Sequence, residues 1–313
     1  MGHDRKFRFG VTASSAVAGS TWSELARRIE DLGYSTMFVA DHFVDTELAP
    51  LPALAFAAEA TTTLRVGMLV LGNDYKHPAV VAKEAATLDV LSGGRLEFGL
   101  GAGWMTADYD ALGLTLDPAG VRIARLEEAL AVVRRAWAEG AFSYRGSHYE
   151  IREYDARPKP VQRPYPPILV GGGGRKVLQL AGRVADIVGI NPNLRAGEIG
   201  VDVARDSLAA NTDQKLQWVR EGAGDRFDDI ELQIRYQIAA ITDDARGLAE
   251  SLAPMFGITA DEALSSSVAL LGTVDEVCDL LIERRARWGV SYVVVGGDAF
   301  DAFAPVVARL TGT

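Results

Sequence analysis

Short apolar runs alternate along the whole chain with stretches in which apolar side chains recur every three or four residues. A run such as Leu96–Leu100 is too short and too apolar for a half-exposed strand, and it fits a parallel strand that is buried on both faces. The pattern predicts eight strands: Phe7–Thr12, Thr36–Ala40, Arg65–Leu71, Leu96–Leu100, Ile168–Val170, Ile187–Ile190, Leu232–Ile241 and Tyr292–Val295.

Helical stretches separate these strands. In the first of them, Leu25, Ile29 and Leu32 fall on one face, and Thr21 with Glu24 forms a capping-box pattern at its start. Regular alternation of strands and helices predicts an α/β fold, a (β/α)8 TIM barrel with insertions, and a doubly wound parallel sheet is the alternative. We expect residues 1–313 to form a single domain.

Two segments are longer than a minimal β/α unit requires, and we interpret them as insertions. The segment near 140–167 is rich in Tyr, Arg and Pro and is predicted to be irregular. The segment near 243–267 carries two helical patterns and is predicted to cover the barrel mouth as a lid or wall.

Composition narrows the class of protein. Hydrophobic residues make up 48% of the 313 and charged residues 24%, which allows a large core. The net charge is −10 and no basic stripe is present, so we expect no nucleic-acid partner. Cys278 is the only cysteine, which suits a reducing compartment. The chain has no apolar run of membrane-spanning length and no signal-peptide core, so we predict a cytoplasmic protein with no membrane partner.

Polar residues and glycines follow several of the predicted strands. In a barrel, the carboxyl ends of the strands carry the active site. The candidates are Asp41 and His42 after the second strand, Gly72 and Asn73 after the third, Gly101 and Gly103 after the fourth, Gly172, Gly173, Gly174 and Arg175 after the fifth, and Asn191 after the sixth. Because glycine has no Cβ, these loops would let a large flat ligand approach the backbone.

The segment Gly171–Lys176 directly precedes a predicted helix. Free N–H groups and the positive end of a helix dipole suit a phosphate, and Arg175 or Lys176 could add a charge-assisted hydrogen bond. The alternative interpretation is a flexible turn without a ligand.

His42 is one of four histidines and directly follows a buried strand. Its imidazole could exchange a proton with a reacting group, or it could satisfy a loop carbonyl. Asp41 could orient the imidazole or hydrogen-bond a polar ring of the ligand. Asp108 could face the pocket as a catalytic carboxylate or stabilise the first turn of a helix. No metal site is predicted, because the chain has no H-E-x-x-H motif and no cysteine pair.

Six longer segments carry a resemblance: VADHF at 39–43, PLPALAFAAEATTTLRVGMLVL at 50–71, HPAVVAKEAATLDVLSGGRLEFGLGAGW at 77–104, RIARLEEAL at 122–130, PKPVQRPYPPILVGGGG at 158–174 and ADIVGIN at 185–191. Together they resemble the luciferase-like monooxygenase superfamily, and within it the coenzyme F420-dependent oxidoreductases. The resemblance implies the same barrel, a flavin or deazaflavin ring at its mouth and a homodimer.

The resemblance also assigns roles to residues. It implies that Gly172 to Arg175 bind the cofactor phosphate and that Asp41 and His42 are the family's Asp-His pair. It implies a non-prolyl cis peptide after the third strand, at Gly72–Asn73 or its neighbour. Members of the family often have glutamate where this chain has Asp108, so the role of Asp108 stays open.

The leading hypothesis is a coenzyme F420-dependent oxidoreductase that transfers a hydride between the deazaflavin and a small organic substrate, with His42 acting where charge develops on the substrate. An FMN-dependent monooxygenase is the nearest alternative, and a non-catalytic flavin-binding barrel and an unrelated phosphosugar barrel are the others. The sequence does not identify the substrate. Trp104, Tyr109 and Phe256 are candidates for an apolar pocket wall.

Overall fold

Eight parallel strands close into a barrel in the computed structural model of the chain, which describes residues 5–313. The strands, in their order around the barrel, are β1 (Arg8–Thr12), β2 (Thr36–Val39), β3 (Arg65–Met68), β5 (Leu96–Gly101), β8 (Ile168–Gly172), β9 (Ile187–Ile190), β10 (Glu231–Arg235) and β13 (Val290–Gly296). The barrel is closed because β3 pairs with β5 as well as with β2. The predicted (β/α)8 barrel is therefore confirmed, and an open doubly wound sheet is excluded.

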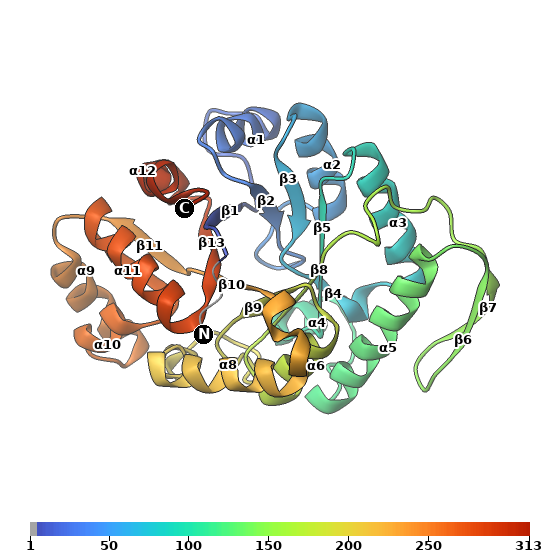
Figure 1. Cartoon of the computed structure of the whole chain (residues 1–313). Helices are drawn as coiled ribbons and strands as arrows, with labels where there is room; N and C mark the ends of the chain where they lie inside the picture. The colour runs from blue at the N-terminus through green and yellow to red at the C-terminus, as the bar shows by residue number, and fades with distance from the viewer. Residues whose placement is uncertain (1–4) are drawn as a thin grey trace.

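Helices surround the barrel on the outside (Figure 1). The main ones are α1 (Trp22–Asp31), α2 (Pro50–Ala60), α3 (Pro78–Leu91), α5 (Ala119–Trp137), α6 (Arg175–Val184), α8 (Ala209–Ala223), α11 (Val274–Trp288) and α12 (Phe300–Leu310). The capping box at Thr21 and Glu24 forms as the sequence predicts, and Leu25 and Ile29 on the same helix are buried. Apolar helix faces against an apolar sheet give the main core.

A second, smaller cluster fills the barrel interior. It contains Phe38, Leu169, Ile187, Tyr292 and Val294. The ring of Phe38 needs a glycine opposite it, because a Cβ on Gly67 would lie 2.6 Å from the Phe38 ring. The barrel is thus a packed core below its mouth.

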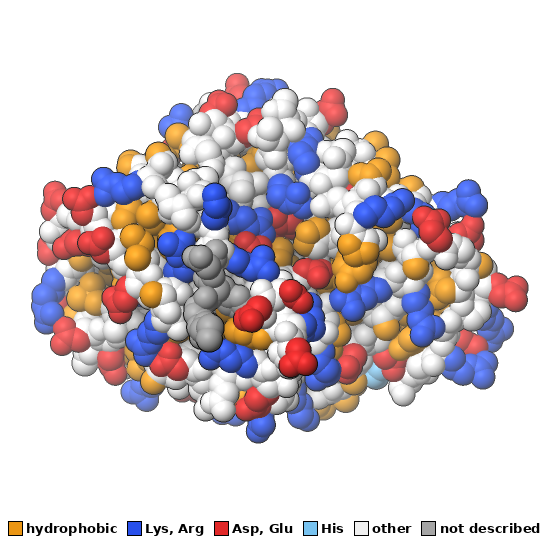
Figure 2. All heavy atoms as spheres, in the orientation of Figure 1, with side chains coloured by type: hydrophobic (Ala, Val, Ile, Leu, Met, Phe, Trp, Pro, Cys, Tyr) orange, Lys and Arg blue, Asp and Glu red, His pale blue; other side chains and the backbone are white. Residues whose placement is uncertain are grey.

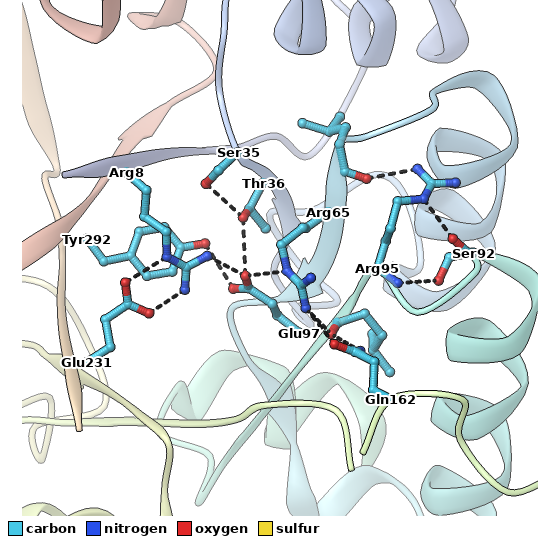
Figure 3. A network of polar contacts seen from close by, with 12 residues as sticks. Arg8, Ser35, Thr36, Arg65, Ser92, Arg95, Glu97, Gln162, Glu231 and Tyr292 are labelled. Carbon is cyan, nitrogen blue, oxygen red and sulfur yellow. Dashed lines mark hydrogen bonds and ion pairs between the residues drawn. The ribbon is translucent and has the colours of Figure 1, made fainter. Parts of the chain in front are cut away.

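Charged side chains fill the amino-terminal end of the barrel (Figure 3). Glu97 is buried and accepts hydrogen bonds from Arg8, from Arg65 at 2.8 Å and from the Tyr292 hydroxyl at 2.9 Å. Arg8 also pairs with Glu231. Burial would raise the pKa of Glu97, but Arg8 and Arg65 hold it below its ordinary value. Arg65 also donates to the Leu96 carbonyl at 2.9 Å and to the Gln162 side chain at 3.0 Å, and the sequence patterns did not predict this network.

The predicted strand Leu232–Ile241 is wrong, because the chain changes partner in its middle. Tyr236 N donates to Val294 O at 2.7 Å, within the barrel, but Gln237 N donates to Val268 O at 2.8 Å. The second half becomes β11 (Ile238–Ile241), which pairs with the unpredicted strand β12 (Ala269–Gly272) in a separate small sheet. Periodicity could not show this, because both halves remain strand and the change of partner leaves no mark in the pattern.

The third predicted strand, Arg65–Leu71, is also divided. It ends as β3 at Met68, and a two-residue strand, β4 (Leu71–Gly72), follows and pairs with β5. The peptide bond Leu69–Val70 between them is cis. A non-prolyl cis peptide therefore follows the third strand as expected, but its predicted position at Gly72–Asn73 or the adjacent bond is wrong.

The two insertions differ in character. The segment near 140–167, predicted to be irregular, instead contains an antiparallel hairpin of β6 (Phe142–Arg145) and β7 (Glu150–Tyr154). The segment near 243–267 contains the two predicted helices, α9 (Ala245–Leu252) and α10 (Ala260–Ser265), joined by a 3-10 turn at Ala253–Phe256. Further short elements are α4 (Thr106–Leu112), α7 (Val201–Asp206) and 3-10 turns at Asn73–Tyr75 and Gly224–Asp229.

The surface carries both signs of charge. On the face drawn in Figure 2, Lys and Arg side chains are interspersed with Asp and Glu. Within residues 5–313, no helix combines the length and the apolar character needed to cross a bilayer.

Candidate active site

A cavity of about 940 Å³ opens at the carboxyl ends of the barrel strands. Residues that follow β2, β4, β5, β8, β9 and β10 line it, together with parts of the segment that contains α9 and α10. The loops that the sequence places at one end of the barrel therefore do surround a common space, as the fold requires.

His42 and Asp108 form a hydrogen-bonded pair at this cavity. The Nδ1 atom of His42 lies 2.7 Å from Oδ2 of Asp108, and the imidazole lines the cavity. The Asp108 side chain is completely buried, and its Oδ1 accepts from the backbone N–H of Phe43 at 2.8 Å and of Val44 at 3.2 Å. Because a carboxylate only accepts hydrogen bonds, Nδ1 carries the hydrogen, and Nε2 is left available.

The pairing brings together residues far apart in the sequence. Asp108 lies in the first turn of α4, and His42 lies directly after β2. Asp108 does occupy a helix amino terminus, but its carboxylate contacts the His42 loop. Nε2 of His42 has no hydrogen-bond partner among residues 5–313, and its ring makes a T-shaped contact with the Trp104 ring, with centroids 5.6 Å apart. The imidazole is fixed on one side and faces the cavity.

Asp41 has a different position from the one that its sequence neighbourhood suggests. Its Oδ2 accepts from Gly72 N at 3.0 Å, so it joins the end of β2 to β4 and makes no hydrogen bond to His42. Burial raises the pKa of Asp41, and the Gly72 N–H offsets part of this rise. Asp41 lines the cavity, so it remains within reach of a ligand.

Asn73 lies outside the cavity lining. It is buried, with 3% of its surface exposed, and its amide donates to the Tyr149 hydroxyl at 3.2 Å. Its neighbour Gly72 does line the cavity, as does Tyr75, whose hydroxyl lies 3.5 Å from Asp108. Burial raises the pKa of Tyr75, and the Asp108 carboxylate adds to the rise.

The glycines of the loops pack tightly against protein atoms as well as facing the cavity. Gly103 has a φ of +74°, and a Cβ there would lie 2.1 Å from the Tyr109 hydroxyl. A Cβ on Gly173 would lie 2.4 Å from the Pro192 backbone. A Cβ on Gly101 would lie 2.6 Å from Val70. Close packing between loops is therefore a second reason for glycine at these positions, one that the sequence analysis did not consider.

The amino terminus of α6 opens on the cavity. Gly172, Gly173 and Gly174 line it, and Gly174 is the N-cap without a side chain to bond the first N–H groups. The Arg175 guanidinium lies 3.1 Å from Glu221 on α8. Lys176 and Asn191 also line the cavity. The predicted phosphate loop has the required helix terminus, whereas the Arg175 charge is already paired.

The polar residues of the cavity that the sequence analysis missed include Thr12, Arg235 and Gln237. The Nε atom of Arg235 donates to the Thr12 hydroxyl at 3.1 Å, and its Nη1 donates to Gln237. Burial lowers the pKa of the Arg235 guanidinium, and Asp298 and Asp45 partly offset this. A signal was present, because Arg235 is the one cation within the predicted strand Leu232–Ile241.

One side of the cavity is apolar. Trp104 and Phe256 line it as suggested from the sequence, but Tyr109 does not. Tyr109 is fully buried, and its hydroxyl donates to Asp74 at 2.9 Å. Further apolar lining comes from α7, β11, β12 and the segment with α9 and α10, through Val203, Ile238, Leu252, Ile258 and Leu271.

The chain is similar to known proteins over most of its length. Residues 6–211 match the model of the luciferase-like monooxygenase family. An FMNH(2)-dependent dimethylsulfone monooxygenase of Pseudomonas putida is 32% identical over 213 residues, which cover 64% of this chain and 58% of that enzyme. An F420-dependent glucose-6-phosphate dehydrogenase of Microbacterium testaceum is 32% identical over 187 residues, which cover 57% of this chain and 55% of that enzyme. The matched segments thus span little more than half the length of these relatives.

A solved structure shows the same fold. The coenzyme F420-dependent tetrahydromethanopterin reductase from Methanopyrus kandleri aligns with a TM-score of 0.75 and 21% identity, over 98% of this chain and 100% of that chain.

Proposed function

The chain belongs to the luciferase-like monooxygenase family, and from that premise we propose that it is a coenzyme F420-dependent oxidoreductase that transfers a hydride between the deazaflavin and a small organic substrate. The observation that carries the proposal is that the His42–Asp108 pair and the amino terminus of α6 open on one cavity.

The residues present fit a phosphate-bearing flat cofactor. At the amino terminus of α6, the N-cap Gly174 offers no side chain in competition for the first N–H groups, and Lys176 adds a positive charge at the cavity. Gly172, Gly173 and Gly174 would hold the phosphate, and the cis Leu69–Val70 segment with Gly101 would face the ring. Asp41 and Asn191 offer polar groups at the same mouth.

When bound, the deazaflavin supplies the hydride-transfer chemistry. The protein supplies the proton. Oxidation of an alcohol or reduction of a carbonyl needs a group that exchanges a proton with the substrate oxygen, and Nε2 of His42 is the available atom. Asp108 fixes the ring orientation and the tautomer, and its charge stabilises the imidazolium.

An FMN-dependent monooxygenase is the second candidate, favoured by the likeness to the dimethylsulfone monooxygenase. The two candidates share the cavity and the phosphate site. They differ in what they need from His42. Hydride transfer to or from a carbon–oxygen bond requires a group that exchanges a proton with the substrate oxygen, and the His42 imidazole is such a group.

Cofactor binding is the test. Oxidised coenzyme F420 and FMN would each be titrated into the purified protein by calorimetry, with riboflavin as the control that lacks a phosphate. We expect micromolar or tighter binding of F420, weaker binding of FMN and little binding of riboflavin. Tighter binding of FMN, with oxygen consumption when it is reduced, would replace the proposal with the monooxygenase. Binding of neither cofactor would overturn both.

A further inference from the structure

Arg235 is a cation at the cavity that makes no direct ion pair, although the carboxylates of Asp45 and Asp298 act on its charge from a greater distance. No carboxylate lies within 4.0 Å of its guanidinium in residues 5–313, and its only hydrogen bonds go to the uncharged Thr12 and Gln237 side chains. The Nη2 atom has no partner in that part of the chain. In contrast, Arg8 and Arg65 at the other end of the same barrel both pair with Glu97. A guanidinium withdrawn from water is normally paired, so one that faces a cavity unpaired is a candidate anion site.

Arg235 lies across the barrel from the segment proposed to face the cofactor ring, although Asn191 follows the neighbouring strand β9. In the barrel order, β10 lies directly across from β3, with β13, β1 and β2 between them on one side. The cis peptide follows β3, and the glycine loops follow β5 and β8. A cofactor ring on that arc would face Arg235 across the mouth. Arg235 therefore meets whatever binds between the ring and the opposite wall.

An apolar compartment begins beside Arg235. Gln237, its hydrogen-bond partner, is followed directly by Ile238 on β11, which lines the compartment. The other apolar residues that line it are Val203, Leu252, Phe256, Ile258 and Leu271. A ligand bound at Arg235 would therefore find hydrocarbon surface on one side and His42 on the same cavity.

We propose that the substrate is an organic anion with an apolar body, whose acid group pairs with Arg235 and whose hydrocarbon part lies in the compartment lined by Phe256 and Leu252. The proposal deepens the proposed function and rests on it, because it names the class of substrate for the same cavity. A bidentate guanidinium–carboxylate pair would occupy the free edge of Arg235, and Thr12 and Gln237 hold that side chain in place.

Binding of simple probes tests the proposal without turnover. Octanoate and 1-octanol, which share the alkyl length and differ in charge, would be titrated by calorimetry into the wild-type protein. The variants are Arg235→Gln and Phe256→Ala. Matched controls are Arg145→Gln, an exposed arginine on the β6–β7 hairpin, and Met255→Ala, which is 73% exposed beside Phe256.

We expect wild type to bind octanoate at least about tenfold more tightly than octanol. Arg235→Gln should remove most of that preference and leave octanol unchanged, whereas Phe256→Ala should weaken both probes. The two control variants should behave as wild type. Equal binding of octanoate and octanol by wild type, or an unchanged preference in a folded Arg235→Gln protein, would overturn the proposal.

F420 binding by the same proteins separates this proposal from the proposed function. We expect Arg235→Gln to bind F420 as tightly as wild type does. An equal loss of F420 and octanoate affinity would place Arg235 in the cofactor site and overturn the substrate assignment. If wild type binds octanoate through Arg235 but binds neither F420 nor FMN, the cofactor proposal fails and the anion site stands.

Discussion

Replacement of Asp108 by asparagine should reverse the tautomer of His42. In the wild-type protein the Asp108 carboxylate accepts from His42 Nδ1 at 2.7 Å and from two backbone N–H groups. An amide oxygen can still accept from Phe43 N and Val44 N, which leaves the amide NH2 facing Nδ1. Since that NH2 can only donate, Nδ1 must become the acceptor, and the hydrogen must move to Nε2.

The energetic cost follows from the number of hydrogen bonds lost. Asp108→Asn keeps all three contacts but replaces charge-assisted bonds with neutral ones, which should cost about 1–2 kcal/mol of unfolding free energy. Asp108→Ala strands two backbone N–H groups and should cost about 2–4 kcal/mol.

Two measurements check this reasoning. With only four histidines in the chain, side-chain ¹⁵N shifts should resolve the His42 ring and report which nitrogen carries hydrogen. Urea unfolding of the two variants measures the stability difference. An Asp108→Asn protein that retains hydrogen on Nδ1, or that is as unstable as Asp108→Ala, would refute the assigned hydrogen-bond network.

Three further predictions follow from the site and its scaffold. His42→Ala should lower turnover by about 10²–10⁴-fold and leave F420 affinity unchanged. Steady-state kinetics and calorimetry would check this, and a parallel loss of F420 affinity would assign His42 a binding role instead. Gly173→Ala should lower the free energy of unfolding by about 1–3 kcal/mol, because its Cβ would lie 2.4 Å from the Pro192 backbone. The control variant Gly174→Ala, whose Cβ would have its nearest neighbour at 3.7 Å, should melt close to wild type. Equal melting temperatures of the two variants would contradict the packing argument. Partial burial would raise the pKa of Glu30, but the N–H groups of residues 62–64 lower this pKa from 4.5 to about 2. The Glu30 carboxylate therefore contributes to stability above pH 4.5, and this contribution is lost as the pH falls toward 2. After allowance for solvent screening, Glu30→Gln should cost up to about 2 kcal/mol at neutral pH and nothing near pH 2; a pH-independent difference in urea unfolding would argue against this assignment.

Periodicity was sufficient for the barrel, because repeated burial on both faces leaves a signal in nearly every strand. It failed at Leu232–Ile241, where both halves are strands but the hydrogen-bond partner changes from β13 to the segment before β12. It also treated Leu96–Leu100 as purely a core strand, although Glu97 within it is the centre of a buried ionic network. A strand pattern indicates that residues are buried, but it does not indicate which strand they pair with or which charged side chains lie next to them.

The sequence by itself determined the order of strands and helices and the set of loops at the barrel mouth, because local periodicity and glycine positions encode them. Only the tertiary structure decided which residues meet there. It paired His42 with Asp108 across 66 positions in the chain, and it brought Gly72 N to donate to the Asp41 carboxylate. It also placed Arg235 at the cavity without a direct ion pair. These outcomes depend on distances between separate loops, which closure of the barrel fixes and which no local pattern contains.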